Sequence, residues 1–354
     1  MKFIHIADVH IGATPDAEYP WAAQREQEIL RSFQHITHLC NEQEIDLLLI
    51  AGDLFHRQPL IRELKEINYY FAKLRRTQVV FIAGNHDYIG ARSNYLGFEW
   101  NSNVHMLIEK TMDSIYLEEI NTEVYGFSYH MRDITEPRYN KVYPSCEERI
   151  NILLAHGGDE KNIPIDKKEL LQSGFDYIAL GHIHKPEIFG EHMAYSGSLE
   201  PMDKNEIGPR GYIYGEMDKE GELCNIHLEF VPNSIRQYIK AEIKVDQGIT
   251  SGELADKVRE LILENGVSNL YILQLTGIRD ADILFSKKDL ISLGNIIDVI
   301  DQTVPDYDFD ALYEENQDNI IGFFIKSIRE NGQKSEISDK ALYYGIEALL
   351  NIRK

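Results

Sequence analysis

Short apolar runs alternate with helix-like stretches over the first two hundred residues of the chain. The apolar runs are Phe3–Ala7, Asp46–Ala51, Val79–Ala83, Ile150–Ala155 and Tyr177–Leu180. Residues 21–44 form one helix-like stretch, and residues 60–76 form another, with apolar side chains at helical spacing. Continuous apolar runs separated by helices are typical of βαβ units whose strands are buried on both faces. The pattern therefore predicts an α/β fold with helices and strands in layers.

The pattern changes after residue 193. Residues 211–217 and 223–231 flank a turn and predict a β-hairpin. A second region then predicts strands at 238–245, 269–276 and 296–304, and helices at 286–293 and at 251–265, the latter with Ser251 as its N-cap. Helices are predicted at 313–330 and 338–352. We therefore expect a larger domain at 1–233, a small αβ capping domain at 234–308 and C-terminal helices at 309–354.

Composition limits the classes of protein to which the chain can belong. With 354 residues, of which 43% are hydrophobic, it is long enough for about two packed domains. No apolar run approaches the ~20 residues that span a bilayer, and the segment after Met1-Lys2 is too short for a signal peptide. Three distant cysteines favour neither a disulfide framework nor a thiolate metal site. We therefore expect a cytoplasmic protein with no membrane partner.

The net charge of −22, from 36 basic and 58 acidic residues, argues against binding of nucleic acid by bulk charge. A DNA-binding surface would have to be a local patch or come from a partner. The local candidate is a basic cluster around the 60–76 helix that includes Arg57, Arg62 and Lys65. A solvated helix face is the alternative explanation for these side chains.

Polar side chains follow each of the five apolar runs. In chain order they are Asp8 and His10, then Asp53 and His56, then Asn85, His86 and Asp87, then His156, and finally His182 and His184. In open α/β sheets the carboxyl ends of the strands are where sites form. Unpaired carboxylates and imidazoles are costly to bury in a core, so a shared site explains them better than a core does.

Asp, His and Asn without Cys form an oxygen and nitrogen ligand set, which suits Mn, Fe, Zn or Co better than Ca. Seven candidate ligands exceed what one tetrahedral ion needs, which favours a centre with two metal ions. Such centres hold two ions about 3.5–4 Å apart, which stabilise the attacking and leaving oxygens of an in-line displacement. One carboxylate must then bridge the ions, and Asp53 is the candidate.

Taken in order, D-x-H, G-D-x-x-H, G-N-H-D, a lone strand-end His and G-H-x-H resemble the calcineurin-like metallophosphoesterase superfamily. Residues 52–56, Gly-Asp-Leu-Phe-His, resemble its DNA-repair exonuclease branch, which contains bacterial SbcD- and YhaO-type proteins and their MRE-type relatives. Protein Ser/Thr phosphatases instead carry an Asp-Arg-Gly ending in that motif, where this chain has His56-Arg57-Gln58. The resemblance covers about residues 1–232 and implies a β-sandwich flanked by helices.

The resemblance also implies a role for each site residue. It assigns Asp8, His10, Asp53 and His184 to one metal ion, and Asp53, Asn85, His156 and His182 to the other. It makes His86 the histidine that stabilises or protonates the reacting phosphate, Asp87 the residue that orients it, and His56 a further active-site histidine. Members of the family are typically Mn-dependent, with Fe, Zn and Co as alternatives here.

Two further surfaces predict partners. Ile61, Tyr69 and Tyr70 lie on the outer face of the 60–76 helix, next to the aromatic segment 95–100, and the resemblance implies that the corresponding helices form a homodimer. The C-terminal helices carry amphipathic stripes. These stripes either pack on the capping domain or dock onto a coiled-coil ATPase of the SbcC type, as the resemblance implies.

The leading prediction is a metal-dependent DNA exonuclease or endonuclease that acts on double-stranded ends or single strands in DNA repair. A small-molecule phosphodiesterase or phosphatase with the same chemistry is one alternative. A DNA-end-binding subunit without catalytic activity is the other, and the complete set of ligands argues against it. The capping domain favours DNA, because it would be surplus for a small substrate.

Overall fold

The computed structural model describes residues 1–221, 223–331 and 336–351. The chain divides into two compact units, Met1–Tyr238 and Ile239–Lys354. The finer division into three parts, with a boundary near residue 308, stays a prediction. No helix in the described part of the chain is long and apolar enough to cross a membrane.

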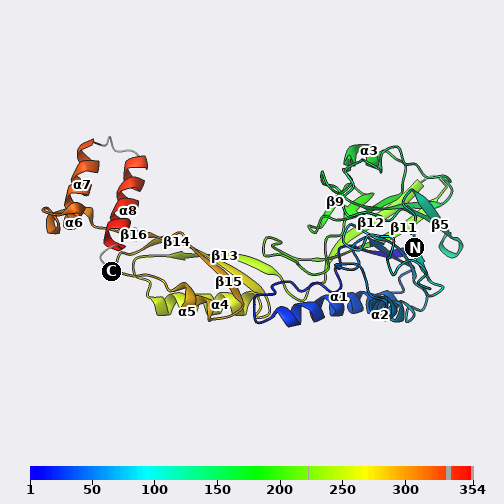
Figure 1. The fold of residues 1–354 in the computed structure, drawn as a ribbon, viewed down its shortest axis with the longest axis horizontal. Coiled ribbons are helices and arrows are strands. Elements are labelled where there is room, and N and C mark those ends of the chain that lie inside the picture. Colours follow the sequence, from blue (N-terminus) through cyan, green and yellow to red (C-terminus); the bar gives the residue numbers. More distant parts are fainter. Residues whose placement is uncertain (222, 332–335, 352–354) are drawn as a thin grey trace. The chain divides into compact units, whose positions relative to one another are not determined.

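The first unit contains two six-stranded sheets (Figure 1). The first sheet has the order β12-β11-β1-β2-β3-β4, in which β1 to β4 are parallel and the hairpin β11–β12 pairs antiparallel with β1. Its strands are β1 (Lys2–Ile6), β2 (Leu47–Ala51), β3 (Gln78–Ile82), β4 (Val104–Met106), β11 (Gly211–Glu220) and β12 (Leu223–Pro232).

The second sheet has the order β5-β6-β7-β8-β10-β9, with a parallel centre made of β6, β7, β8 and β10. Its strands are β5 (Asp113–Leu117), β6 (Thr122–Gly126), β7 (Ile150–His156), β8 (Tyr177–Gly181), β9 (Glu187–Phe189) and β10 (Met193–Tyr195). The five predicted apolar runs therefore all form strands, but they belong to two different sheets. Sequence analysis did not predict β4, β5, β6, β9 or β10.

Strand alternation explains why these runs are continuously apolar. Successive side chains of a strand point to opposite faces of the sheet. In β2, Leu47, Leu49 and Ala51 enter the core between the two sheets, and Leu48 and Ile50 enter the core under the helices. Both faces of the strand are buried, so every position must be apolar. The predicted α/β sandwich is confirmed.

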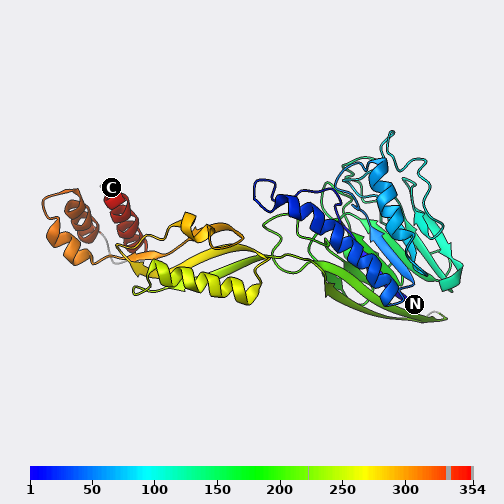
Figure 2. The ribbon, with the colours of Figure 1, turned by 90° about the horizontal axis from the view of Figure 1, so that it is seen from below.

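Helices cover the outer faces of this sandwich. Helices α1 (Ala22–Glu42) and α2 (Ile61–Phe71) lie side by side over the first sheet (Figures 1 and 2). The short helix α3 (Lys167–Leu171) contributes Leu170 to the core on the outer face of the second sheet. Helices α1 and α2 begin and end within a few residues of the predicted stretches, except that α2 ends five residues before the predicted Arg76, and α3 was not predicted.

The second unit has its own sheet and core. Strand β13 (Tyr238–Val245) leads into it, and β14 (Leu270–Asp280) pairs with β13, β15 (Ile296–Asp301) and β16 (Val304–Asp306). Helices α4 (Ser251–Asn265) and α5 (Lys287–Ile291) pack on this sheet. The N-cap of α4 is Thr250 and not Ser251. The Thr250 hydroxyl accepts a hydrogen bond from the Glu253 backbone N–H, and the Glu253 carboxylate accepts one from the Thr250 backbone N–H.

The C-terminal helices differ from their predicted bounds. The predicted helix at 313–330 is two helices, α6 (Phe309–Glu315) and α7 (Ile320–Asn331), and α8 spans Glu336–Asn351. Residue 352 of the last predicted helix lies outside the described residues. Ile321, Ile325, Leu342 and Ile346 form a small buried cluster between α7 and α8. Part of the predicted amphipathic stripes is therefore used within this segment.

Candidate metal centre

The predicted site residues come together where the two sheets of the first unit meet. Asp8, Asp53 and Asn85 follow strands β1, β2 and β3 of one sheet, whereas His156 ends β7 and His182 follows β8 of the other. Strand β8 approaches β2 so closely that a Cβ on Gly181 would lie 2.0 Å from the Ala51 carbonyl oxygen. A glycine is needed at this contact, and it lets ligands from the two sheets face one another.

The side chains on the β1 side of the centre are within reach of one cation. His10 Nε2 lies 3.0 Å from His184 Nε2 and 3.9 Å from Asp53 Oδ2. Asp8 Oδ1 lies 3.9 Å from the same nitrogen of His184. Asp8, His10 and His184 have ligand atoms within 4.8 Å of one another, and so do Asp8, Asp53 and His156.

Asn85 joins the side chains from the second sheet. Its Oδ1 lies 2.9 Å from His156 Nε2 and 3.1 Å from His182 Nδ1. Asp53 Oδ2 lies 3.5 Å from His156 Nε2, so this carboxylate stands between the two sets of residues. All seven predicted ligands are thus brought together, and their division between two metal ions stays a prediction.

The residues present fit a metal centre. Every donor is a carboxylate, imidazole or amide atom, and Asp8, Asp53 and His156 are at most 1% exposed. Buried charges in proteins are paired or coordinate metal ions. Such donors suit divalent transition metals. Because Asp8 belongs to both groups and Asp53 lies between them, two neighbouring cations can be accommodated.

The backbone at the centre is held in an unusual conformation. Asp8, His10, Asp53 and His182 have positive φ angles of 49°, 53°, 51° and 92°. A non-glycine residue in this region costs of order 1–3 kcal/mol and persists where the surrounding structure enforces it. Four such residues within one cluster indicate that the surrounding structure holds these side chains in place despite the strain in the backbone.

Charges within the cluster shift the pKa values of its members. Burial alone would raise the pKa of Asp53, but His156 and His10 outweigh burial and hold this pKa well below its usual range. Burial alone would lower the pKa of His156, but the Asp53 and Asp8 carboxylates raise it to about 9. Asp53 is therefore a carboxylate at neutral pH.

In three of the histidines, the ring nitrogen that faces away from the other predicted ligands lies within hydrogen-bond distance of an oxygen atom. His156 Nδ1 donates to the Ala51 carbonyl at 2.9 Å, His182 Nε2 lies 2.7 Å from Asp159 Oδ2, and His184 Nδ1 lies 2.6 Å from Glu206 Oε1. Sequence analysis did not identify Asp159 or Glu206. Glu206 lies 22 residues after its histidine, and no local spacing marks either residue.

The three predicted catalytic residues lie beside the ligands. The rings of His56 and His86 are 5.3 and 4.7 Å from the His10 ring, and all three histidines form one further group of potential ligands. His86 Nδ1 donates to the His56 carbonyl at 3.0 Å. Asp87 instead accepts from the Gly84 and Phe55 backbone N–H groups and from the Tyr95 hydroxyl. Among the described residues, Asp87 thus supports the loop and makes no direct hydrogen bond to the His86 ring.

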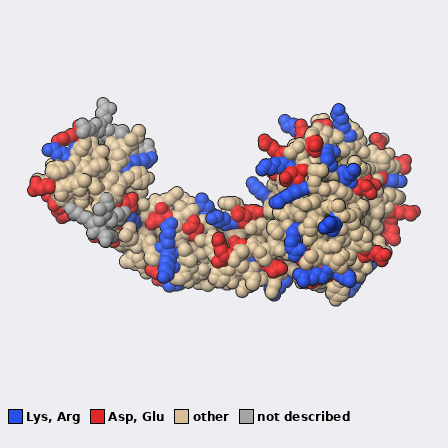
Figure 3. Space-filling model, in the orientation of Figure 1, with Lys and Arg blue, Asp and Glu red and all other residues tan. Residues whose placement is uncertain are grey.

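The predicted DNA-binding cluster has less unbalanced positive charge than its sequence suggests. Arg57 forms a two-pronged ion pair with Glu63, at 2.7 and 3.1 Å, so its charge is largely balanced. Arg62 and Lys65 are exposed on α2. Figure 3 shows basic and acidic side chains interspersed over the visible face of the first unit.

The predicted dimer surface is smaller than expected. Ile61 and Tyr69 are 44% and 58% exposed, but Tyr95 is buried. Tyr70, Phe98 and Trp100 pack against the core beneath α1 and α2. What remains is a small patch on α2, extended by the exposed Leu96.

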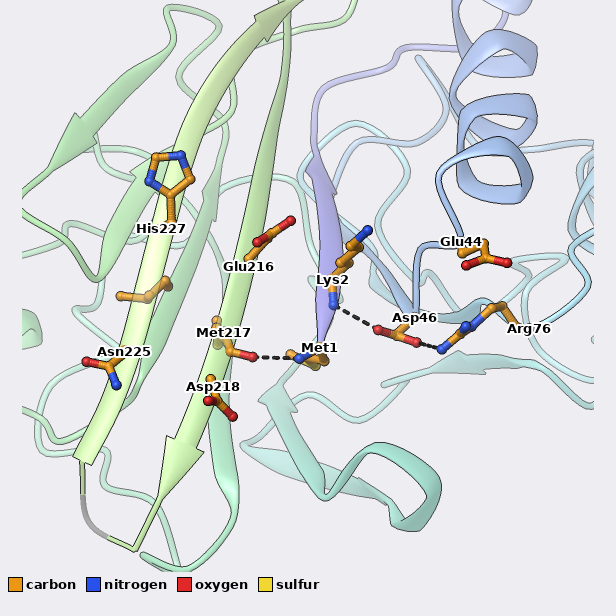
Figure 4. Close-up of a pocket in the computed structure, with 11 residues that line it drawn as sticks. Met1, Lys2, Glu44, Asp46, Arg76, Glu216, Met217, Asp218, Asn225 and His227 are labelled. Carbon is orange, nitrogen blue, oxygen red and sulfur yellow. Dashed lines mark hydrogen bonds and ion pairs between the residues drawn. The ribbon is translucent and has the colours of Figure 1, made fainter.

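A separate cavity of about 560 Å³ lies at the opposite, amino-terminal end of β1 (Figure 4). Some of its charged groups are partnered: Asp46 accepts from the Lys2 backbone N–H and pairs with Arg76, and the Met1 ammonium donates to the Met217 carbonyl. The groups of potential ligands found among the described residues all lie at the other end of the strands.

Comparisons with known proteins concern mainly the first unit. A family model described as calcineurin-like phosphoesterase matches residues 1–186. The chain is 30% identical over 233 residues to a Bacillus subtilis protein described as uncharacterized metallophosphoesterase YhaO, covering 60% of this chain and 56% of the relative. It is 32% identical over 263 residues to the DNA double-strand break repair protein Mre11 of Methanocaldococcus jannaschii, covering 69% and 70%.

The protein with the same description from Methanopyrus kandleri is 28% identical over 263 residues, with 65% of this chain and 56% of the relative covered. The chain thus spans little more than half the length of two of these three relatives.

Proposed function

This chain belongs to the calcineurin-like phosphoesterase family, and from that premise we propose that it is a two-metal-dependent nuclease that hydrolyses phosphodiester bonds at DNA ends. That it is a metal-dependent phosphoesterase, in the branch that contains the YhaO and Mre11 proteins, follows from the family itself. The observation that carries the nuclease proposal is the convergence of seven ligands from two sheets, with His56 and His86 beside them.

The proposed centre has Asp8, His10, Asp53 and His184 around one cation and Asp53, Asn85, His156 and His182 around the other, with Mn as the favoured metal. When bound, two divalent cations supply Lewis-acid activation of a water nucleophile and neutralise phosphate charge. Asp53 stays ionised between the two sites because His156 and His10 lower its pKa. The strands that end at the site fix the positions of the other proposed ligands.

His86 is proposed to act on the phosphate. Its Nδ1 proton is committed to the His56 carbonyl, so Nε2 is the nitrogen left to meet a substrate oxygen. When the ring is protonated on both nitrogens, the Nε2 N–H can stabilise negative charge on the phosphate or donate its proton to the leaving oxygen. Asp87 contributes by holding the loop that carries His86, and exposed His56 lines the same edge of the centre.

DNA is the proposed substrate because the Mre11 relatives are described as DNA double-strand break repair proteins. The net charge of −22 makes electrostatic attraction of DNA weak, so contacts must be local. We propose exposed Arg62 and Lys65, with Arg57 after release from Glu63, as such contacts. A small-molecule phosphodiesterase remains the second candidate, and the same charge is the observation that favours it.

Assembly is proposed at two surfaces. The α2 patch of Ile61, Tyr69 and Leu96 would pair two copies of the chain, and the segment 309–354 would dock onto a coiled-coil ATPase of the SbcC type in the cytoplasm. In that segment, Ile320 and Phe323 are 65% and 60% exposed on α7 and outside its small core. Deletion of 309–354 should preserve hydrolysis of a small phosphodiester and abolish co-purification with that ATPase.

One comparison tests the substrate. Purified protein with Mn²⁺ is incubated with end-labelled duplex DNA and, separately, with bis-p-nitrophenyl phosphate. A nuclease shortens the DNA from its ends or cuts it internally. Hydrolysis of the small ester with intact DNA would favour the second candidate. Inactivity on both, with DNA binding retained, would leave the non-catalytic DNA-end-binding subunit.

A further inference from the structure

Two carboxylates that belong to neither ligand set each meet a strand-end histidine. We propose that Glu206 and Asp159 are positioning residues that select the metal-binding nitrogen of two histidines: Nε2 of His184 and Nδ1 of His182. The proposal rests on the metal centre proposed above, and it predicts opposite tautomers for two histidines that are only two residues apart in the chain.

Glu206 is built to accept a proton from His184. Its Oε1 lies 2.6 Å from His184 Nδ1, whereas its Oε2 accepts from the Met202 backbone N–H at 2.9 Å. Arg210, which is 3% exposed, places its Nε 3.7 Å from the same Oε2. One oxygen is therefore tied to the turn and to a buried cation, and the other is left for the histidine. His184 Nε2 then faces Asp8 and His10.

Asp159 repeats the arrangement for His182 with a different scaffold. Its Oδ1 accepts from the backbone N–H groups of Lys161 and Asn162, both at 2.8 Å, and its Oδ2 lies 2.7 Å from His182 Nε2. The two backbone donors hold Oδ1, and Oδ2 is the oxygen that faces the histidine ring. An ionised carboxylate can only accept, so Nε2 of His182 carries the proton and Nδ1 faces Asn85.

The two glycines before Asp159 allow the chain to turn so that Asp159 reaches His182. Gly157 and Gly158 have φ angles of 147° and 129°, and a Cβ on Gly158 would lie 2.2 Å from the Tyr195 hydroxyl. The chain can therefore turn immediately after His156, the last residue of β7, and bring Asp159 back to His182. The same short segment thus supplies one ligand and the residue that orients another.

The chemical consequence is a ligand set with its lone pairs aimed inward before metal arrives. A metal-binding histidine donates its other N–H to a carboxylate, a carbonyl or water, and loss of that partner typically costs 10–100-fold in metal affinity. Neutral imidazole in water favours the form protonated on Nε2. His184 must therefore be held in the less populated form, whereas His182 is held in the more populated one. Loss of Glu206 should consequently weaken metal binding more than loss of Asp159.

The tautomers are tested directly by long-range ¹H–¹⁵N NMR of the full-length, metal-free protein above the pKa of each histidine. We expect a proton on Nδ1 of His184 and on Nε2 of His182. The opposite tautomer at either residue in the wild-type protein would overturn its assignment. This readout does not depend on activity, so the proposal can fail while the nuclease function stands, and the reverse.

Metal affinity provides the second test, with Mn²⁺ alone as the probe in calorimetry. Glu206→Ala should weaken binding by 10–100-fold and Asp159→Ala by a smaller factor, and Glu206→Gln and Asp159→Asn, which keep an acceptor oxygen, should fall between each Ala variant and the wild type. Glu160→Gln and Glu191→Gln are matched controls, because both glutamates are exposed in the neighbouring loops. Ala variants that bind Mn²⁺ within twofold of the wild type would overturn the positioning role. If an Ala variant does not fold, the wild-type tautomers decide.

Discussion

The two units of the chain differ in backbone strain and in the burial of polar groups. All nine described non-glycine residues with positive φ lie in the first unit, and four of them belong to the candidate centre. In the described part of the second unit, positive φ is confined to Gly266 and Gly277. The described residues of the second unit follow local preferences, whereas the first unit departs from them where its ligands converge and at five further positions.

Buried polar residues are divided in the same way. In the first unit, Asp8, Asp53, Asp87 and His156 are all nearly inaccessible to solvent. The buried polar residues described in the second unit are Arg279 and Asn316 alone. Strain and buried charge cost stability. Four strained residues and the buried Asp8, Asp53 and His156 share one site, which indicates that function maintains them there.

The largest expected effect is that of Asp53→Asn. It should abolish phosphodiester hydrolysis and reduce bound metal, because the carboxylate between the two groups is lost. Asn has the same shape and tolerates a φ near 51°, so the fold should persist. Activity on bis-p-nitrophenyl phosphate, metal content and circular dichroism measure the three consequences. Full activity with two metals per chain would contradict the assignment of Asp53.

His86→Ala should separate catalysis from metal binding. Loss of a group that stabilises charge or transfers a proton typically lowers the rate by 10²–10⁴-fold. Metal content should stay close to that of the wild type. His38→Ala is the matched control, since this histidine lies exposed on α1 and pairs only with Glu42. If metal is lost together with the rate, His86 is a ligand and not a catalytic residue.

Two glycines allow the same substitution to be compared between the units. In the first unit, Gly181→Ala drives a Cβ into the Ala51 carbonyl and should destabilise by about 3 kcal/mol or more. In the second unit, Gly252 lies in helix α4, and the atom nearest to its added Cβ would be 3.9 Å away. Gly252→Ala should stabilise by about 0.5–1 kcal/mol. Chemical denaturation of each variant measures both signs, and equal effects would contradict the contrast between the units.

A further prediction concerns pH. Burial lowers the pKa of His5 to about 3, so the folded protein keeps this ring neutral while the unfolded chain binds a proton below its usual pKa of 6.5. The unfolded state then holds more protons, so stability falls as pH decreases from 6.5 towards 3, by about 1.4 kcal/mol per pH unit. His5→Phe should flatten this slope in urea unfolding between pH 6.5 and 5.

All thirteen histidines lie in the first unit, so the unfolding transition of the second unit should depend little on pH in this range. An unchanged slope in His5→Phe would show that other histidines dominate the pH dependence.

The strands and the ligands could be predicted because each signal is local. A run such as Leu47–Ala51 must be apolar at every position when both faces are buried, and the polar residues after it mark the strand end. Residue type limits the candidates to side chains with oxygen or nitrogen donors, and the resemblance to the family selects seven of them, from Asp8 to His184. The structure brings these seven together, and their role as ligands stays a prediction.

What could not be predicted depends on contacts between distant segments. The division of the five strands between two sheets was not predicted, because β5 and β6 lack a continuous apolar run: β5 is only partly buried, and β6 carries Thr122 and Glu123 at buried positions. Glu206 reaches His184 through a turn that also binds Met202 and Arg210. Asp87 is adjacent to His86 in sequence, yet its bonds go to Tyr95 and the Gly84 loop. Such partners follow from tertiary packing and leave no spacing in the chain.

The origin of the ligands in both sheets also has a consequence for synthesis of the protein. Asp8 and His184 are separated by 175 intervening residues, so the centre closes one of the longest loops in its unit. Contacts of such high sequence separation form late, because the entropy of closing the loop must be paid first. A nascent chain that still lacks β7 and β8 has Asp8, His10 and Asp53 but no partner histidines from the second sheet. The growing chain is therefore inert until the segment after β8 has been made, and hydrolytic capacity arises only when folding of the unit is nearly complete.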